Sequence, residues 1–132
     1  MITICMNFDE MELKIDGHAG QAEPGRDIVC AAVSTLFYTL AQGVLRCRKM
    51  LKRDPVIKEE SGAGYLRCKP NEEDRETILR MYWLISEGFQ MIRQNYPAYI
   101  CFFSEGLAPE KYLAYTETEM RLASQTAEEK GA

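Results

Sequence analysis

The sequence predicts an α+β fold: one domain with a mainly antiparallel sheet and two helices on one face. Three observations lead to this prediction. Apolar residues alternate with polar ones in short segments typical of strands, they recur every three or four residues in two long segments typical of helices, and glycine or proline lies between the segments. The predicted order is ββα-ββα-β with a C-terminal helical tail. This order favours helices that cover one side of a sheet.

Alternation predicts the first two strands. The apolar residues of 2–8 alternate with shorter or more polar neighbours, and those of 11–15 alternate with charged ones. We therefore expect two strands joined near Asp9. Residues 17–25 follow with three glycines and a proline, which predicts a mobile loop.

A long helix is predicted next. Apolar residues recur at helical spacing from Val29 to Val44, and Asp27 stands where an N-cap residue belongs, so we expect a helix from Asp27 to about Met50. The uncharged run 28–45 is close to the minimum length of a membrane span, about 18 residues. Because this run contains several hydroxyl and amide side chains, we interpret it as a buried helix and expect no membrane contact.

A hairpin and a second helix follow. Residues 55–59 and 65–69 are strand candidates on either side of a turn at residues 61–64. Asn71 then stands at an N-cap position ahead of three acidic residues. Apolar residues from Ile78 to Ile92 recur at helical spacing, so they predict the second helix.

Pro97 ends this helix and begins the last part of the chain. Residues 98–103 are almost wholly apolar and rich in strand formers, so they predict an interior strand. Residues 104–132 place Pro109 at a plausible first helical position and predict one short helix with a frayed end. We therefore divide the chain into a folded domain over 1–103 and a tail over 104–132.

Charge and cysteine content limit the function. The chain has 16 Lys and Arg against 20 Asp and Glu, and this net charge of −4 has the wrong sign for a nucleic-acid-binding protein. The five cysteines form no Cys-x-x-Cys pair, and the single histidine, His18, completes no local metal site with them. Cys5 and Cys101 lie in apolar runs, where we expect free, buried thiols. Free thiols indicate a reducing compartment, and residues 1–10 do not resemble a secretory signal, so we expect a cytoplasmic protein.

Cys30 is the cysteine best placed for chemistry. If Asp27 caps the helix, Cys30 is the third helical residue, near the unpaired amides and the positive dipole end that favour a thiolate. His18 can supply an imidazole if the loop folds back over the start of the helix. At about 100° per residue, Asp27, Cys30 and Ser34 fall within about 60° of one another, so they can line one cleft.

These residues allow two interpretations. In the first, Cys30 attacks a carbonyl group, His18 takes and returns the proton, and amides at the helix start hold the oxyanion. In the second, Cys30 is a packed helix cysteine, His18 is an ordinary loop residue, and Asp27 serves only as an N-cap. The chemistry of the residues leaves both open. The other four cysteines have no activating partner, and we assign them structural roles.

A longer motif favours the first interpretation. The segment 17–34 contains Gly-His-Ala, a glycine-containing loop, and then Gly-x-Asp-Ile-Val-Cys-Ala-x-x-Ser. This segment closely resembles the signature of the ribosomal-processing cysteine proteases, the Prp family. The predicted order of elements over residues 1–103 is also similar to the fold of that family. The resemblance therefore implies a cysteine protease domain over 1–103.

The resemblance also implies a substrate and partners. Members of this family are bacterial cytoplasmic enzymes that remove an N-terminal extension from large-subunit ribosomal protein L twenty-seven. Their cut follows a pair of aromatic residues. They are generally homodimers, and the resemblance implies no cofactor.

Position in the motif implies the role of each site residue. His18 corresponds to the general base and Cys30 to the nucleophile. Asp27 and Ser34 correspond to supporting polar residues, and Gly17 shapes the turn. The flexible loop that would close over the substrate consists of Ala19, Gly20, Gln21, Ala22, Glu23, Pro24, Gly25 and Arg26.

The motif leaves two features and one alternative function open. Phe37, Tyr38 and Tyr65 are candidates to line an apolar pocket for the aromatic residues of the substrate. The tail from Ser104 has no assigned role. The alternative to a protease is a noncatalytic dimeric module that binds a ribosomal protein or a ribosome assembly factor.

Overall fold

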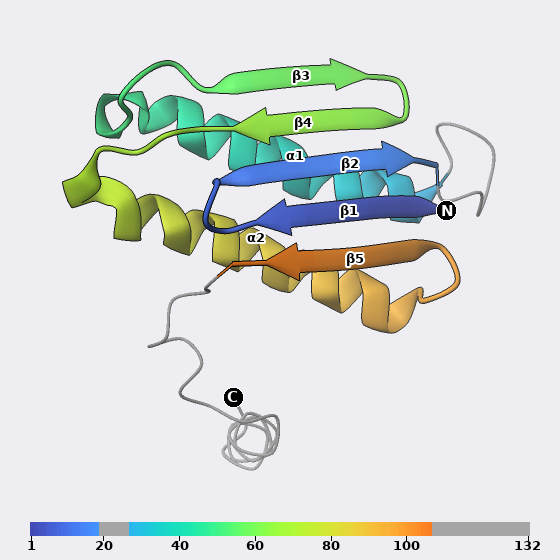
Figure 1. Cartoon of the computed structure of the whole chain (residues 1–132). Coiled ribbons are helices and arrows are strands. Elements are labelled where there is room, and N and C mark those ends of the chain that lie inside the picture. The colour runs from blue at the N-terminus through green and yellow to red at the C-terminus, as the bar shows by residue number, and fades with distance from the viewer. Residues whose placement is uncertain (19–26, 107–132) are drawn as a thin grey trace, which may run out of the picture.

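A computed structural model describes residues 1–18 and 27–106 of the chain. Figure 1 shows this part as two layers, a five-stranded sheet with both helices on the same face, as the sequence predicts. The predicted loop at 19–26 and the predicted tail helix at Pro109 lie outside the described residues. The elements are β1 (Ile2–Asn7), β2 (Glu12–Gly17), α1 (Ile28–Arg46), a 3-10 helix (Arg48–Met50), β3 (Val56–Glu60), β4 (Ala63–Arg67), a second 3-10 helix (Glu72–Asp74), α2 (Arg75–Asn95) and β5 (Ile100–Glu105).

The sheet is mainly antiparallel. Its strand order is β3-β4-β2-β1-β5. The pairs β1–β2, β2–β4 and β3–β4 are antiparallel, whereas β5 runs parallel to β1. A parallel neighbour needs a crossover connection, and α2 supplies it between β4 and β5.

The prediction of an interior final strand is wrong, because β5 lies at the edge of the sheet beside β1. Its apolar composition has a different cause. Ile100 is buried, and the ring of Phe102 packs against Phe89 of α2 at a centroid distance of 5.9 Å. Phe103 points the other way and is 60% exposed. The strand continues to Glu105, and the division of the chain at residue 103 stays a prediction.

The core lies between the sheet and the two helices. In β1 the residues alternate strictly, so Ile2, Ile4 and Met6 are buried beneath the helices. The helices contribute their predicted apolar stripes to the same core. The buried helix residues are Val29, Val33, Phe37, Leu40, Ala41 and Val44 from α1, and Ile78, Leu79, Tyr82, Ile85, Ser86 and Phe89 from α2.

By length and composition α1 is apolar enough to cross a membrane, a test that the core helix of a soluble protein also passes. In the described chain its apolar stripe packs onto the sheet, and the helix also packs beside α2 (Figure 1). This packing agrees with the predicted buried helix. The α-helix ends at Arg46 rather than Met50, because the chain turns there so that Leu51 becomes buried and pairs with Pro70.

Two other predicted boundaries are wrong. The hairpin turn contains only Ser61 and Gly62, because Ala63 and Gly64 already pair with β3. Asn71 precedes a 3-10 turn instead of capping α2, and its side-chain amide donates to the carbonyl of Lys49 at 3.3 Å. The turn and the cap were both predicted from residue type alone. The sequence does not show which hydrogen-bond partners these residues have in the folded chain.

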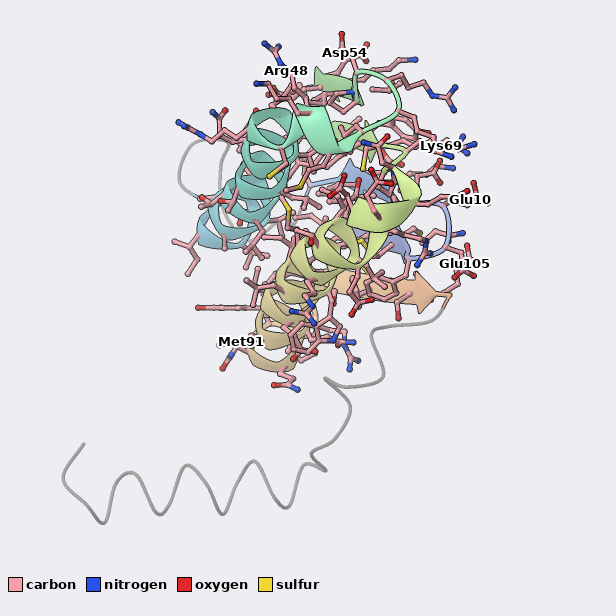
Figure 2. The ribbon with its side chains drawn as sticks, turned by 90° about the vertical axis from the view of Figure 1, so that its left-hand side faces the viewer. Glu10, Arg48, Asp54, Lys69, Met91 and Glu105 are labelled. Carbon is pink, nitrogen blue, oxygen red and sulfur yellow. The ribbon has the colours of Figure 1, made fainter. Side chains whose placement is uncertain are left out.

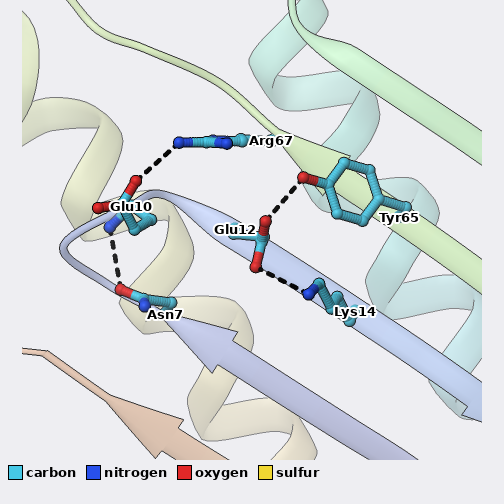
Figure 3. Close-up of polar contacts among 6 residues, drawn as sticks. All are labelled: Asn7, Glu10, Glu12, Lys14, Tyr65 and Arg67. Carbon is cyan, nitrogen blue, oxygen red and sulfur yellow. Dashed lines mark hydrogen bonds and ion pairs between the residues drawn. The ribbon is translucent and has the colours of Figure 1, made fainter.

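The other face of the sheet is open and polar. Figure 3 shows Tyr65 donating to Glu12, Lys14 pairing with the same carboxylate, and Arg67 pairing with Glu10. The hydrogen bond to Glu12 raises the pKa of Tyr65. Cys5 lies exposed on β1, contrary to the expectation that its apolar neighbours bury it. Its neighbours Ile4 and Met6 are buried instead, as period-two alternation requires.

Candidate active site

A cavity of about 500 Å³ lies at one end of the two-layer structure. Four parts of the chain form it: the start of β1, the end of β2, the β3–β4 hairpin and the first turns of α1, which lie at the same end of the sheet in Figure 1. The described lining residues are Ile2, Ile15, Gly17, His18, Asp27, Cys30, Val33, Ser34, Phe37, Tyr38, Glu59, Glu60, Gly62, Ala63 and Gly64.

Asp27 holds the start of α1 beneath this cavity. Its backbone is extended, and its carboxylate Oδ1 accepts hydrogen bonds from the amides of Val29 and Cys30, each at 3.0 Å. The side chain is only 6% exposed. The predicted N-cap is therefore present, and it makes Cys30 the third residue of the helix, at the positive end of the helix dipole.

His18 follows the last residue of β2. Gly17 has a φ of +101°, which a residue with a side chain rarely adopts, so it can turn the chain here. Its amide donates to the carbonyl of Gly62 at 2.7 Å and ties this turn to the β3–β4 hairpin. The imidazole of His18 is exposed and lies against Gly62.

The structure brings together the predicted site residues that it describes. His18, Cys30, Asp27, Ser34 and Gly17 all line the one cavity. Cys30 is half-buried, and Ser34 is exposed one helical turn further along α1. Asp27, Cys30 and Ser34 therefore line one cavity, as their angular spacing on the predicted helix indicates. The predicted loop residues 19–26 lie outside the described part.

One wall of the cavity is apolar. Phe37 and Tyr38 contribute to it, and their rings meet edge to face at a centroid distance of 5.7 Å and an interplanar angle of 74°. Gly64 lets the ring of Phe37 approach closely, because a Cβ at this position would lie 3.1 Å from that ring. The prediction that Tyr65 joins this wall is wrong. Successive strand residues point to opposite faces, and Tyr65 lies on the open face with Glu12 (Figure 3).

The hairpin contributes residues that the sequence did not single out. Glu59 accepts a hydrogen bond from the Tyr38 hydroxyl across the cavity wall, and Glu60 lies beside it in the lining. Gly62 and Gly64 come close to His18 and Phe37 respectively. The glycine-rich turn was a signal of close backbone approach, but which segment approaches it depends on the tertiary fold.

Burial excludes Cys68 as a nucleophile. It is buried, its Sγ contacts the Tyr82 hydroxyl at 3.5 Å, and burial raises the pKa of its thiol. Cys5 and Cys101 lie on β1 and β5, and Cys47 follows the end of α1. Cys30 is therefore the cysteine that lines the cavity.

Within residues 1–18 and 27–106, no group of three or more His, Cys, Asp or Glu residues is arranged to hold a metal ion.

The cavity suits attack by a thiol on a carbonyl group, with one difference from expectation. The thiol of Cys30 and the imidazole of His18 line the same cavity, and a thiol beside a base is the pair of groups that such an attack requires. Several of the predicted oxyanion donors at the helix start are already engaged. The amides of Val29 and Cys30 donate to the Asp27 carboxylate, and the amide of Ala31 donates to the backbone carbonyl of Asp27. An oxyanion held by these amides would have to share them with Asp27.

Solved structures share this fold. A structure of the essential ribosomal processing protease Prp from S. aureus, with a covalently linked product peptide, matches at a TM-score of 0.65 and 22% identity, covering 80% of this chain and all of that one. A second S. aureus Prp structure, with a substrate peptide, matches at 0.58 and 21%, again covering 80% and 100%. SMU.848 from Streptococcus mutans matches at 0.55 and 22%, covering 79% and 93%.

Sequence comparison gives the family. A search of curated proteins finds no match. Residues 1–101 match the sequence model of the family described as cysteine protease Prp, and this match includes every predicted catalytic and supporting residue. Since it covers more than half of the chain, the chain belongs to the Prp family of cysteine proteases.

Proposed function

We propose that this chain is a cysteine endopeptidase that removes the N-terminal extension of large-subunit ribosomal protein L twenty-seven, cutting after an aromatic pair. The observation that supports the proposal most strongly is the single cavity that holds both His18 and Cys30. Membership of the Prp family supplies the reaction class. The related S. aureus protein is a ribosomal processing protease that has been seen with a substrate peptide, which supports the choice of substrate.

The proposed mechanism uses Cys30 and His18 as a dyad. His18 accepts the thiol proton as Cys30 Sγ attacks the scissile carbonyl, and the proton then passes to the leaving amine as the peptide bond breaks. The product is a thioester between Cys30 and the extension. Water, deprotonated by His18, attacks this thioester, and its hydrolysis releases the extension as a carboxylic acid and restores the thiol.

Asp27 and Ser34 support this chemistry from the same helix. Asp27 fixes the first turn of α1 through two hydrogen bonds, so Cys30 stays at the positive helix end, where a thiolate is favoured. The Ser34 hydroxyl lies on the same side of the helix and lines the cavity. We assign Ser34 a polar contact to the substrate or to the thiolate.

The apolar wall suits the aromatic residues of the substrate. Phe37, Val33 and Ile15 supply apolar surface beside Cys30. An aromatic side chain buried there gains hydrophobic contact and edge-to-face ring packing. Cleavage next to an aromatic residue follows if that ring anchors the peptide with its carbonyl group near Cys30.

Incubation with a peptide that spans the extension of the host's ribosomal precursor tests this proposal. We expect cleavage after the aromatic pair, detected by mass spectrometry. Cys30→Ala should abolish cleavage, and His18→Ala should slow it by about 100-fold or more, since a positioned general base typically contributes this much. Cys5→Ala is the matched control, because Cys5 lies exposed on the sheet away from the cavity, and it should cleave like the unmodified protein.

Two outcomes would contradict the proposal. If the folded Cys30→Ala protein still cleaves the peptide, Cys30 is not the nucleophile. If the folded, unmodified protein cleaves neither the peptide nor the intact precursor, the assigned substrate is wrong. In that case a noncatalytic module that binds a ribosomal protein becomes the better account.

We also propose that the protein is a cytoplasmic homodimer, as the resemblance implies. Exposed apolar side chains on β5 and at the start of β1, Phe103 and Met1, offer surface that a second copy can bury. Light scattering at micromolar concentration should give twice the mass of one chain. A monomer under these conditions would contradict the proposal.

A further inference from the structure

The β3–β4 hairpin contacts the segment that carries His18. Gly62 is the second residue of its two-residue turn, because Glu60 already pairs with Ala63. The carbonyl of Gly62 accepts a hydrogen bond from the amide of Gly17 at 2.7 Å. The tip of the hairpin is therefore fastened to the residue immediately before His18.

The imidazole of His18 fills the space where a side chain at position 62 would lie. A Cβ added to Gly62 would be 2.6 Å from His18 Nε2 and 3.2 Å from both Cδ2 and Cε1. Unbonded carbon atoms prefer separations of about 3.5–4.0 Å. The ring can therefore keep this position only because residue 62 has no side chain.

The backbone gives a second, independent reason for glycine at this position. The φ of Gly62 is +77°, in the left-handed region that glycine adopts without steric cost. This requirement belongs to the turn and does not involve His18. A useful experiment must separate the two effects.

We propose that Gly62 is a positioning residue for His18, because its missing side chain leaves the space that holds the imidazole in the cavity shared with Cys30. This inference rests on the proposed function, in which His18 accepts the thiol proton of Cys30. The His18 ring is exposed and ends a flexible side chain, so a Cβ at position 62 would displace the ring rather than the backbone.

A double-mutant cycle tests this assignment. The rate at which iodoacetamide alkylates Cys30 is measured by mass spectrometry in the unmodified protein, Gly62→Ala, His18→Ala and the double variant. Gly62→Ala should slow alkylation about tenfold when His18 is present, as part of a general base's contribution is lost. It should change the rate by less than about twofold in the His18→Ala background, since no ring remains to be displaced.

Folding stability supplies the readout for the backbone effect. Gly62→Ala should lower the free energy of unfolding by the same amount in both backgrounds, because strain at a positive φ does not depend on His18. Gly106→Ala is the matched control: Gly106 also has a positive φ, +86°, but it contacts Asp9 outside the cavity. Gly106→Ala should lose stability and keep the alkylation rate of Cys30.

A second substitution covers the case in which Gly62→Ala fails to fold. Gly62→Asn also adds a Cβ, but asparagine adopts positive φ more readily than alanine. It should slow alkylation of Cys30 in the same His18-dependent way. Cleavage of the precursor peptide by either variant should show a lower kcat with little change in KM, because the apolar wall is untouched.

Two results would overturn the assignment of Gly62. Equal slowing with and without His18 would trace the loss to the backbone, and unchanged alkylation in Gly62→Ala would mean that the imidazole does not need this space. If His18→Ala itself leaves alkylation of Cys30 unchanged, the proposed dyad fails and the assignment of Gly62 fails with it. That arm of the cycle distinguishes the two failures.

Discussion

At the scale of single residues, Asp27 links the stability of α1 to the geometry of the site. Its Oδ1 accepts from two amides at 3.0 Å while the side chain is only 6% exposed. A carboxylate at a helix N-terminus also interacts favourably with the helix dipole. The same residue lies next to Cys30 in the cavity lining, so the cap fixes where the thiol stands.

Asp27→Ala should lower the free energy of unfolding by about 1–2 kcal/mol, because two amides lose their acceptor. Asp27→Asn should cost less, since its amide oxygen can still accept from the same groups. Urea unfolding of the three proteins measures both differences. An equal loss in the alanine and asparagine variants would show that charge, and not capping, is the larger contribution.

Single residues also show where prediction from the sequence ends. The cap at Asp27 and the place of Cys30 in the helix follow from local rules, and the structure has both. Tyr65 was assigned to the pocket because it is aromatic. Its strand parity puts it on the open face, which depends on the register of β4 against β2. The approach of Gly62 to His18 depends on the same non-local pairing.

At the scale of elements, α2 holds the edge strand β5 against the sheet. Phe89 is fully buried, and its ring packs against Phe102 of β5. Edge strands have a partner on only one side, so their stability relies more on contacts with the neighbouring layer. In sequence, Phe89 and Phe102 lie well beyond the cavity lining, whose described residues fall between positions 2 and 64.

Phe89→Ala should therefore destabilise the protein by about 3–5 kcal/mol, the usual cost of removing a buried phenylalanine ring. Met91→Ala is the matched control on the same helix, because Met91 is 63% exposed and points outward in Figure 2. It should change the free energy of unfolding by less than about 0.5 kcal/mol. Similar losses in the two variants, measured by urea unfolding, would contradict this account of the core.

Elements with strong periodicity were predicted well. The stripes of α1 and α2 and the alternation of β1 and β2 are visible in the sequence because each element buries one side. The edge position of β5 was not predictable in the same way. An apolar strand has the same sequence pattern whether it pairs with a strand on each side or lies at an edge, with one paired strand and a covering helix.

At the scale of the whole molecule, a buried pair of weak acids makes stability depend on alkaline pH. Cys68 and Tyr82 contact one another in the core, and burial raises the pKa of both groups. The native protein therefore keeps both protons at a pH where the unfolded chain loses them. Ordinary thiols and phenols ionise near pH 8.5 and 10 respectively.

This pair should not make the free energy of unfolding depend on pH near neutrality. The free energy of unfolding should then fall as pH rises above about 8.5. The slope contributed by Cys68 is up to about 1.4 kcal/mol per pH unit, and Tyr82 adds a similar slope above about pH 10. Urea unfolding under reducing conditions from pH 7 to 10.5 measures the fall. Cys68→Ala should show a shallower fall above pH 8.5; an identical slope would contradict the buried-thiol account.

The site as a whole forms only through the tertiary fold. The motif of residues 17–34 indicated His18, Cys30, Asp27 and Ser34, because family motifs preserve spacing along one segment. Other lining residues come from β1 and the β3–β4 hairpin, and the strand pairing that brings these elements to that segment is not encoded by local patterns. The hairpin supplies the acidic pair Glu59 and Glu60, and its Gly62 lies against His18.

The most direct test of the central claim compares the reactivity of Cys30 with that of Cys5 in the same native protein. Cys5 is exposed, whereas Cys30 is half-buried, so accessibility alone favours alkylation of Cys5. If Cys30 is the activated nucleophile, iodoacetamide should modify it at least about tenfold faster than Cys5 at neutral pH, and His18→Ala should remove this advantage. Alkylation of Cys5 ahead of Cys30, with no effect of His18→Ala, would contradict the account.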